Sequence, residues 1–312
     1  MVTAWEPNLS RFGPSNNAHT KNILLPQKTI PMTKRLLILT LAASALCGTR
    51  ALADDYGVWL GGTVQKDFSK KLSADVGLGM RAENKLNDLT RYDVDAGLTY
   101  KPLKWLSISG GYTFIRDYNL KSVNDKTEEG GKPKYNVDEA YWRNKHRATF
   151  DVSGSWNIAK FGKNKLVFTV RERYQYTHFV PTHTTQTNYR GYINPEQIGG
   201  YDGDIFYYDG KMFSRATSEL DAKRSKHKHY LRSRFGLEYN IRHSAWTPYA
   251  TYEFSNNLSD QLHLDKQRLT VGVEWKVDKQ HKLDFAYVYN HGADDDNDNN
   301  CHALSIGYKF KF

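Results

Sequence analysis

From residue 56 to residue 312 the chain repeats one pattern, in which apolar and polar side chains alternate along short segments. Between Leu72 and Glu83, for example, Leu, Ala, Val and Met alternate with Ser, Asp, Gly and Arg. A period of two residues is that of a β-strand with two different faces. Eleven such segments of 9–13 residues occur, so the pattern predicts an all-β protein.

The segments fit a transmembrane β-barrel better than a soluble sandwich. A sandwich shows the same alternation, because it buries one face of each sheet and solvates the other. However, the segments match the 9–11 residues of a tilted strand that crosses a membrane. Short turns alternate with longer polar loops, and Tyr and Trp gather near segment ends. We therefore expect a single antiparallel transmembrane β-barrel with short periplasmic turns and long outer loops.

The alternating pattern does not by itself give the number of strands. Bacterial barrels have an even number of strands with both chain ends in the periplasm, whereas eleven segments are found. One further strand could lie in the irregular stretch 180–226, where "GDIFYYDGKMFSR" has β character. We expect about twelve strands, with ten as the alternative. The stretches 119–140 and 180–226 are expected to be loops, and the second could form a lid or a recognition surface.

The last segment places apolar side chains at every second position up to the final residue. Leu304 and Ile306 begin this row, and Tyr308, Phe310 and Phe312 complete it. We expect the row to face lipid. A terminal aromatic residue preceded by alternating aromatic residues also resembles the signal that the outer-membrane assembly machinery reads, so we expect this machinery to be a partner.

The N-terminal region contains a secretion signal. Residues 32–53, "MTKRLLILTLAASALCGTRALA", combine a basic start, an apolar run of about ten residues and small residues before the expected cleavage point. We expect cleavage before Asp54 and localisation in the bacterial outer membrane. Residues 1–31 lack periodicity, and we expect them to be a mis-assigned extension that precedes the true start at Met32. The barrel is then expected to span 54–312.

Composition excludes some other classes. The mean hydropathy is −0.70, and after residue 60 there is no apolar run of the roughly 20 residues that a membrane helix needs. The formal net charge is +10, but the first 53 residues hold six basic side chains and one acidic one. The remaining charge is too small to indicate nucleic-acid binding. Only Cys301 remains after cleavage, which excludes a disulfide framework. We expect no cofactor.

The stretch from Tyr56 to Tyr118 resembles a known family. It contains a Trp in the first strand, the turn "KDFSKKL", an Arg-Tyr strand and the turn "YKPLKWL" before "GGY". These features resemble the Gram-negative outer-membrane family catalogued as domain of unknown function 2490. The resemblance implies a β-barrel in the outer membrane, and it implies no catalytic residue.

The polar faces of the segments predict a lumen that carries both signs of charge. If they line a pore, opposed arcs of charge would select small polar solutes. Alternatively, the charges pair with one another and plug a narrow lumen. The sequence favours neither reading over the other. The predicted lining residues are Arg147, Asp151, Arg171, Arg173, Arg232, Arg234, Glu238, Arg268, Glu274, Asp93 and Asp95, with Asp75 on the same face.

Two other functions have weaker support. A lipid hydrolase would need a His shortly before its Ser, but "YEFSNNLSD" around Ser255 contains none. The protein is therefore not expected to be an enzyme. A surface-exposed binding protein that uses its long outer loops is an alternative. The carboxylates Asp294, Asp295, Asp296 and Asp298 are a weak candidate for a metal site, although a solvated loop that shares divalent ions with lipopolysaccharide explains them better. Outer-membrane lipid and lipopolysaccharide are the expected partners.

Overall fold

The computed structural model describes residues 55–127, 131–292 and 300–312. The predicted signal peptide, the extension before it and the acidic loop 293–299 lie outside these residues. Among the described residues, none forms a helix that is long and apolar enough to cross a membrane.

Sixteen strands and one short 3₁₀-helix make up the described chain. They are β1 (Asp55–Asp67), β2 (Leu72–Glu83), β3 (Asp88–Leu103), β4 (Leu106–Asn119), β5 (Ser122–Thr127), β6 (Pro133–Asp138), β7 (Tyr141–Phe161), β8 (Asn164–Phe179), β9 (Thr182–Ile193), η1 (Pro195–Gly200), β10 (Phe206–Tyr208), β11 (Lys211–Lys223), β12 (Lys226–Asn240), β13 (Trp246–Asn257), β14 (His263–Lys276), β15 (His281–Gly292) and β16 (Cys301–Lys311).

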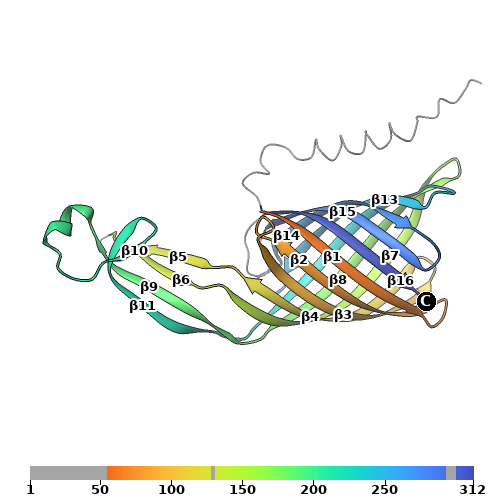
Figure 1. Ribbon diagram of the computed structural model, residues 1–312. Helices are drawn as coiled ribbons and strands as arrows, with labels where there is room; N and C mark the ends of the chain where they lie inside the picture. Colours follow the sequence, from red (N-terminus) through yellow and green to blue (C-terminus); the bar gives the residue numbers. More distant parts are fainter. Residues whose placement is uncertain (1–54, 128–130, 293–299) are drawn as a thin grey trace, which may run out of the picture. The chain divides into compact units, whose positions relative to one another are not determined.

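Eleven of the strands close into a barrel, in the order β1-β16-β15-β14-β13-β12-β8-β7-β4-β3-β2 (Figure 1). The eleven alternating segments of the sequence correspond one to one to these strands. The expectation of twelve or ten strands was wrong. Neighbouring strands in the chain run in opposite directions, so an odd number leaves the first and last strands pointing the same way. They therefore pair in parallel, with Val58 opposite Leu304 and Leu60 opposite Ile306.

The two long connections are not loops, as the sequence had predicted, but form a second sheet of five strands, β10-β11-β9-β6-β5. "GDIFYYDGKMFSR" does form strands β10 and β11, joined by Asp209 and Gly210, both at positive φ. This is the two-residue hairpin that Asp-Gly favours. Two strands of this second sheet are unsuited to the barrel wall, because β5 and most of β9 carry polar side chains on both faces, which lipid does not tolerate. The barrel therefore does not use the whole of 54–312.

The five-stranded sheet has a small aromatic core of its own. Tyr135 and Phe213 are almost fully buried, and Tyr189, Tyr192, Phe206 and Tyr208 pack against them. At the other end of this sheet Lys223 Nζ lies 2.6 Å from Asp138 Oδ2. Although burial acts in the opposite direction, the hydrogen bonds from Lys223 and Gln186 lower the pKa of Asp138. The stabilisation from this pair is therefore present above the normal Asp pKa and is lost as the pH falls through the lowered value.

The two ends of the barrel differ. We call "outer end" the end that carries the connections β4–β7, β8–β12 and β15–β16, and "inner end" the opposite one. The connections at the inner end span only two to five residues, such as 104–105 and 241–245. Strand β1 begins at the outer end, and the chain finishes at the inner end with Phe312. The predicted alternation of short and long connections therefore holds in part, because two of the five connections at the outer end, 84–87 and 258–262, are as short as those at the inner end. The first barrel strand begins at the opposite end from Phe312, which an even-stranded barrel would not show.

The barrel is apolar outside and polar inside. Side chains such as Leu78, Leu98 and Phe150 are more than half exposed on the outer wall. In β16, Leu304, Ile306 and Tyr308 are exposed while Ala303 is buried, and Phe312 just after the strand is exposed too, which confirms the predicted orientation of this strand. A water-soluble protein would not leave so large a continuous apolar surface uncovered. This wall is therefore the lipid-facing surface of a membrane-spanning barrel.

The parallel closure can be tested by cross-linking. In a Cys301→Ser background, Val58→Cys combined with Leu304→Cys is expected to form a disulfide on mild oxidation. The reason is that directly paired Cα atoms fall within the roughly 4.4–6.8 Å that a disulfide needs. The mismatched control combines Val58→Cys with Ile306→Cys, which is offset by two residues. Mobility on SDS gels reports the cross-link. Preferential cross-linking of the mismatched pair would contradict the register.

Candidate functional site

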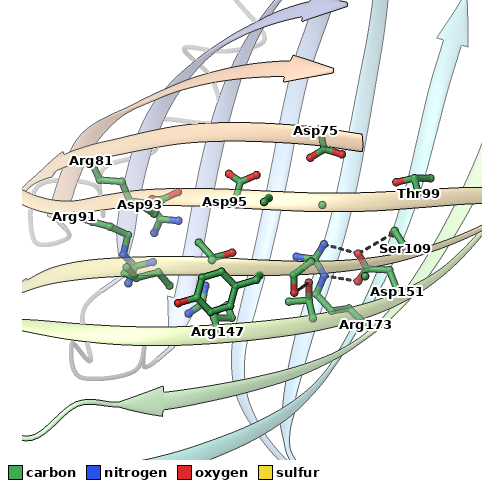
Figure 2. Close-up of a pocket in the computed structure, with 18 residues that line it drawn as sticks. Asp75, Arg81, Arg91, Asp93, Asp95, Thr99, Ser109, Arg147, Asp151 and Arg173 are labelled. Carbon is green, nitrogen blue, oxygen red and sulfur yellow. Dashed lines mark hydrogen bonds and ion pairs between the residues drawn. The ribbon is translucent and has the colours of Figure 1, made fainter. Parts of the chain in front are cut away.

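The predicted lining residues all lie at inward positions of the barrel strands. Arg147, Asp151 and Arg173 surround one cavity together with Asp93 and Asp95 (Figure 2). A second cavity is lined by Arg171, Arg173, Arg232, Arg234 and Arg268. Glu238 and Glu274 share the inward register nearer the inner end, where Glu274 pairs with Lys282 at 2.7 Å. The charged lumen is therefore the candidate functional site.

The first cavity, which we call the acidic cavity after its three neighbouring carboxylates on β2 and β3, has a volume of about 380 Å³ and is lined by four carboxylates and four arginines in all. Asp75, Asp93 and Asp95 project into it from β2 and β3 (Figure 2). Each carboxylate lies across a glycine of the neighbouring strand. A Cβ added at Gly77, for example, would lie 2.4 Å from Asp95 Oδ1. The glycines thus make the room that lets three carboxylates lie against the wall.

An ion pair separates the acidic cavity from the arginine-rich side of the lumen. Arg173 donates to both carboxylate oxygens of Asp151, from Nε at 2.5 Å and from Nη2 at 2.7 Å. Ser109 Oγ also lies 3.4 Å from Asp151 Oδ2 (Figure 2). Two parallel bonds of this kind fix the guanidinium plane. Arg173 lines both cavities, so this pair forms part of the boundary between them.

The second cavity, which we call the arginine cavity, has a volume of about 290 Å³. Glu253 is its central acid, and it accepts hydrogen bonds from both Arg171 and Arg232. Arg232 also donates to Gln175 Oε1 at 2.8 Å. Arg268 donates to Asn290 Oδ1 at 2.6 Å and lies over the ring of Trp59 at 5.2 Å. Trp59 is a residue of the first strand that faces the lumen rather than the lipid.

Buried side chains gather in the lumen near the outer end. Asp117 forms ion pairs with Arg91 and with Lys145, the latter at 2.6 Å, and all three side chains are at most 10% exposed. Phe179 is completely buried beside them. Four cationic side chains surround its ring, at 4.5 Å for Lys145 and Lys226, 5.2 Å for Arg143 and 5.7 Å for Lys228.

This packing extends round the barrel. Every barrel strand except β2 contributes an inward side chain that is at most 9% exposed. Each of these side chains lies within about five residues of the outer end of its strand. Strand β2 instead contributes Arg81 and Glu83, which contact Trp59. We call this set the packed layer: Trp59, Arg91, Asp117, Lys145, Thr177, Phe179, Tyr230, Ser255, Lys266, Asn290 and Cys301. The cavity that adjoins it measures only about 50 Å³. The inner half holds fewer buried side chains.

Sequence reasoning missed the packed layer. Asp117, Lys145 and Phe179 occupy the inward positions of their strands, so the alternation could have assigned them to the lumen. The alternation does not show how deeply these side chains are buried, because an inward position says nothing about whether other side chains surround it in the lumen.

Ser255 and several of the histidines lie on opposite faces of the barrel wall. Ser255 lies at an inward position and is buried. Several histidines instead lie on the outer wall beside tyrosines, with Nδ1–hydroxyl distances of 2.6 Å for His146 and Tyr112 and 2.8 Å for His229 and Tyr174. In the described ranges, no three His, Cys, Asp or Glu side chains are placed to hold a metal ion. Asp294, Asp295, Asp296 and Asp298 lie outside those ranges.

The fold and its charged lumen define a transmembrane β-barrel of the outer-membrane class. The chain belongs to the DUF2490 family, described as a protein of unknown function, whose match covers residues 56–301. Among solved structures, the chain is similar to the translocator domain of autotransporter NalP from Neisseria meningitidis, with 10% identity over 86% of this chain and 96% of that chain and a TM-score of 0.38. None of the curated proteins compared matches the chain.

The ion pairs of the packed layer can be tested by removing their shared acid. Asp117→Asn leaves Arg91 and Lys145 buried without their carboxylate, which is expected to lower the free energy of unfolding by about 3–5 kcal/mol. Urea unfolding of the refolded barrel measures the change. The control is Asp125→Asn in exposed β5, for which we expect a change within about 0.5 kcal/mol. Equal stability of the two variants would contradict a buried ionic layer.

Proposed function

We propose that the protein is a bacterial outer-membrane barrel that is plugged at its outer end and holds the five-stranded sheet at the cell surface as a binding module. The observation that carries the proposal is the packed layer, in which the side chains of Phe179 and Lys145 have almost no exposed surface. A barrel closed in this way is suited to be an anchor rather than a passage. We propose no catalytic role for it.

The five-stranded sheet supports the binding part of the proposal. All six residues of its edge strand β5 are exposed. Large apolar side chains on the same sheet are also open to solvent, with Tyr207 68% and Leu220 76% exposed. An edge strand offers unpaired backbone groups to a partner, and exposed apolar side chains offer contact area. Lipopolysaccharide and outer-membrane lipid remain the proposed surroundings of the barrel.

A passive pore for small polar solutes is the second candidate. The acidic and arginine cavities favour it, because both leave open space in the lumen beside charged side chains, and Asp75, Asp93 and Asp95 lie on a different part of the wall from the five arginines. In a pore the packed layer would have to move aside for solutes to pass.

Conductance in a planar bilayer separates the two candidates. The refolded protein is expected to give no stable conductance steps, because the packed layer blocks ions. Phe179→Ala removes the ring at its centre and is expected to produce steps. Phe235→Ala, on the lipid-facing wall, is the control and should stay silent. Stable steps from the unaltered protein, with an ion preference that shifts in Arg232→Glu, would contradict the plug and establish the pore.

A further inference from the structure

The arginine cavity holds more positive than negative charge. Its lining includes five guanidinium groups but only two carboxylates, Glu253 and Asp284. Asp284 accepts a hydrogen bond from Tyr249 at 2.9 Å. Glu253 is shared by Arg171 and Arg232, and Arg173 uses Asp151, which lies outside this cavity. Charges held inside a protein are costly unless they are paired, so the cavity lacks negative charge.

The arginines also have unused donors. The Nε groups of Arg171 and Arg232 are buried and have no hydrogen-bond partner. Within the part of the chain that the structure describes, Arg234 forms neither an ion pair nor a hydrogen bond. It does lie within electrostatic range of Glu253 and of two other arginines. Buried donors without partners are uncommon in folded proteins and call for an explanation.

We propose that the arginine cavity binds a small oxyanion of phosphate-like geometry. A planar guanidinium presents paired donors that match the oxygens of phosphate, and several such groups round one cavity can satisfy a tetrahedral anion from several sides. The cavity, at about 290 Å³, is several times larger than the roughly 30 Å³ that one water occupies. The hydroxyl groups of Thr251 and Thr270 line the same wall and add donors.

The surrounding contacts hold the arginines ready for such a ligand. Glu253 fixes Arg171 and Arg232, Asp151 fixes Arg173, and Trp59 with Asn290 fixes Arg268. Arg234 is left as the cation with no direct partner and is the residue most dependent on the anion. A free anion fits this site better than a lipid headgroup, because the polar lumen offers no place for acyl chains. The proposal does not depend on whether the barrel conducts.

Isothermal titration of the refolded full chain with inorganic phosphate tests the proposal. We expect saturable binding of phosphate and of sulfate, and much weaker binding of chloride, which cannot match the guanidinium fork. Arg234→Gln is expected to weaken phosphate binding about tenfold or more, since it removes a charged donor. Arg234→Lys keeps the charge but loses the paired donors of the guanidinium group. Its affinity for phosphate should therefore lie between those of the unaltered chain and Arg234→Gln. Arg215→Gln, at an exposed position of β11, is the matched control and should bind as the unaltered chain does.

Three results would overturn the proposal. Phosphate that binds no better than chloride would show that the cavity holds only water. Unchanged binding in both Arg234 variants would place the anion elsewhere. Displacement of phosphate by phosphatidylglycerol added to the micelles would assign the phosphate chemistry to a lipid headgroup. Heat-modifiability on SDS gels identifies folded variants, and Arg234→Lys keeps the test available if Arg234→Gln does not fold.

Discussion

The whole lumen depends on one constraint, which is that charges enclosed by a closed barrel must find partners inside it. Asp117 meets this need for Arg91 and Lys145, and Glu253 meets it for Arg171 and Arg232. Each shared carboxylate joins strands that are not all direct neighbours, so the ion pairs brace the wall from within. The same constraint explains why lipid-facing positions are apolar, since a charge there would have no partner at all.

The distribution of these partners gives the barrel its asymmetry. Near the outer end, cations, carboxylates and the ring of Phe179 pack against one another and have little exposed surface. Towards the inner end fewer inward side chains are buried, and Asp75, Asp93 and Asp95 line an open cavity instead. Charge is thus neutralised by packing at one end and left to solvent or ligands at the other. The proposed anchor and the alternative pore differ in whether the packed layer closes the outer end.

The sequence revealed the wall of the barrel but not its contents. The alternation in β2 and β16 predicted which side chains face lipid, because period two follows directly from strand geometry. The strand count failed because parity was taken from other barrels, whereas the polar character of β5 and β9 excludes them from the wall. The contacts of Phe179, Lys145 and Glu253 could not be predicted, since they depend on the register between strands and on the depth of each side chain, which the pattern does not encode.

Thiol accessibility in the lumen tests the central claim most directly. In a Cys301→Ser background, Thr99→Cys lies in the acidic cavity and Thr177→Cys lies in the packed layer, where Thr177 has no exposed surface. With a membrane-impermeant thiol reagent, we predict rapid labelling of Thr99→Cys, and labelling of Thr177→Cys only after unfolding in urea. Equal labelling rates for the two cysteines in the folded barrel would contradict a lumen that is closed at its outer end.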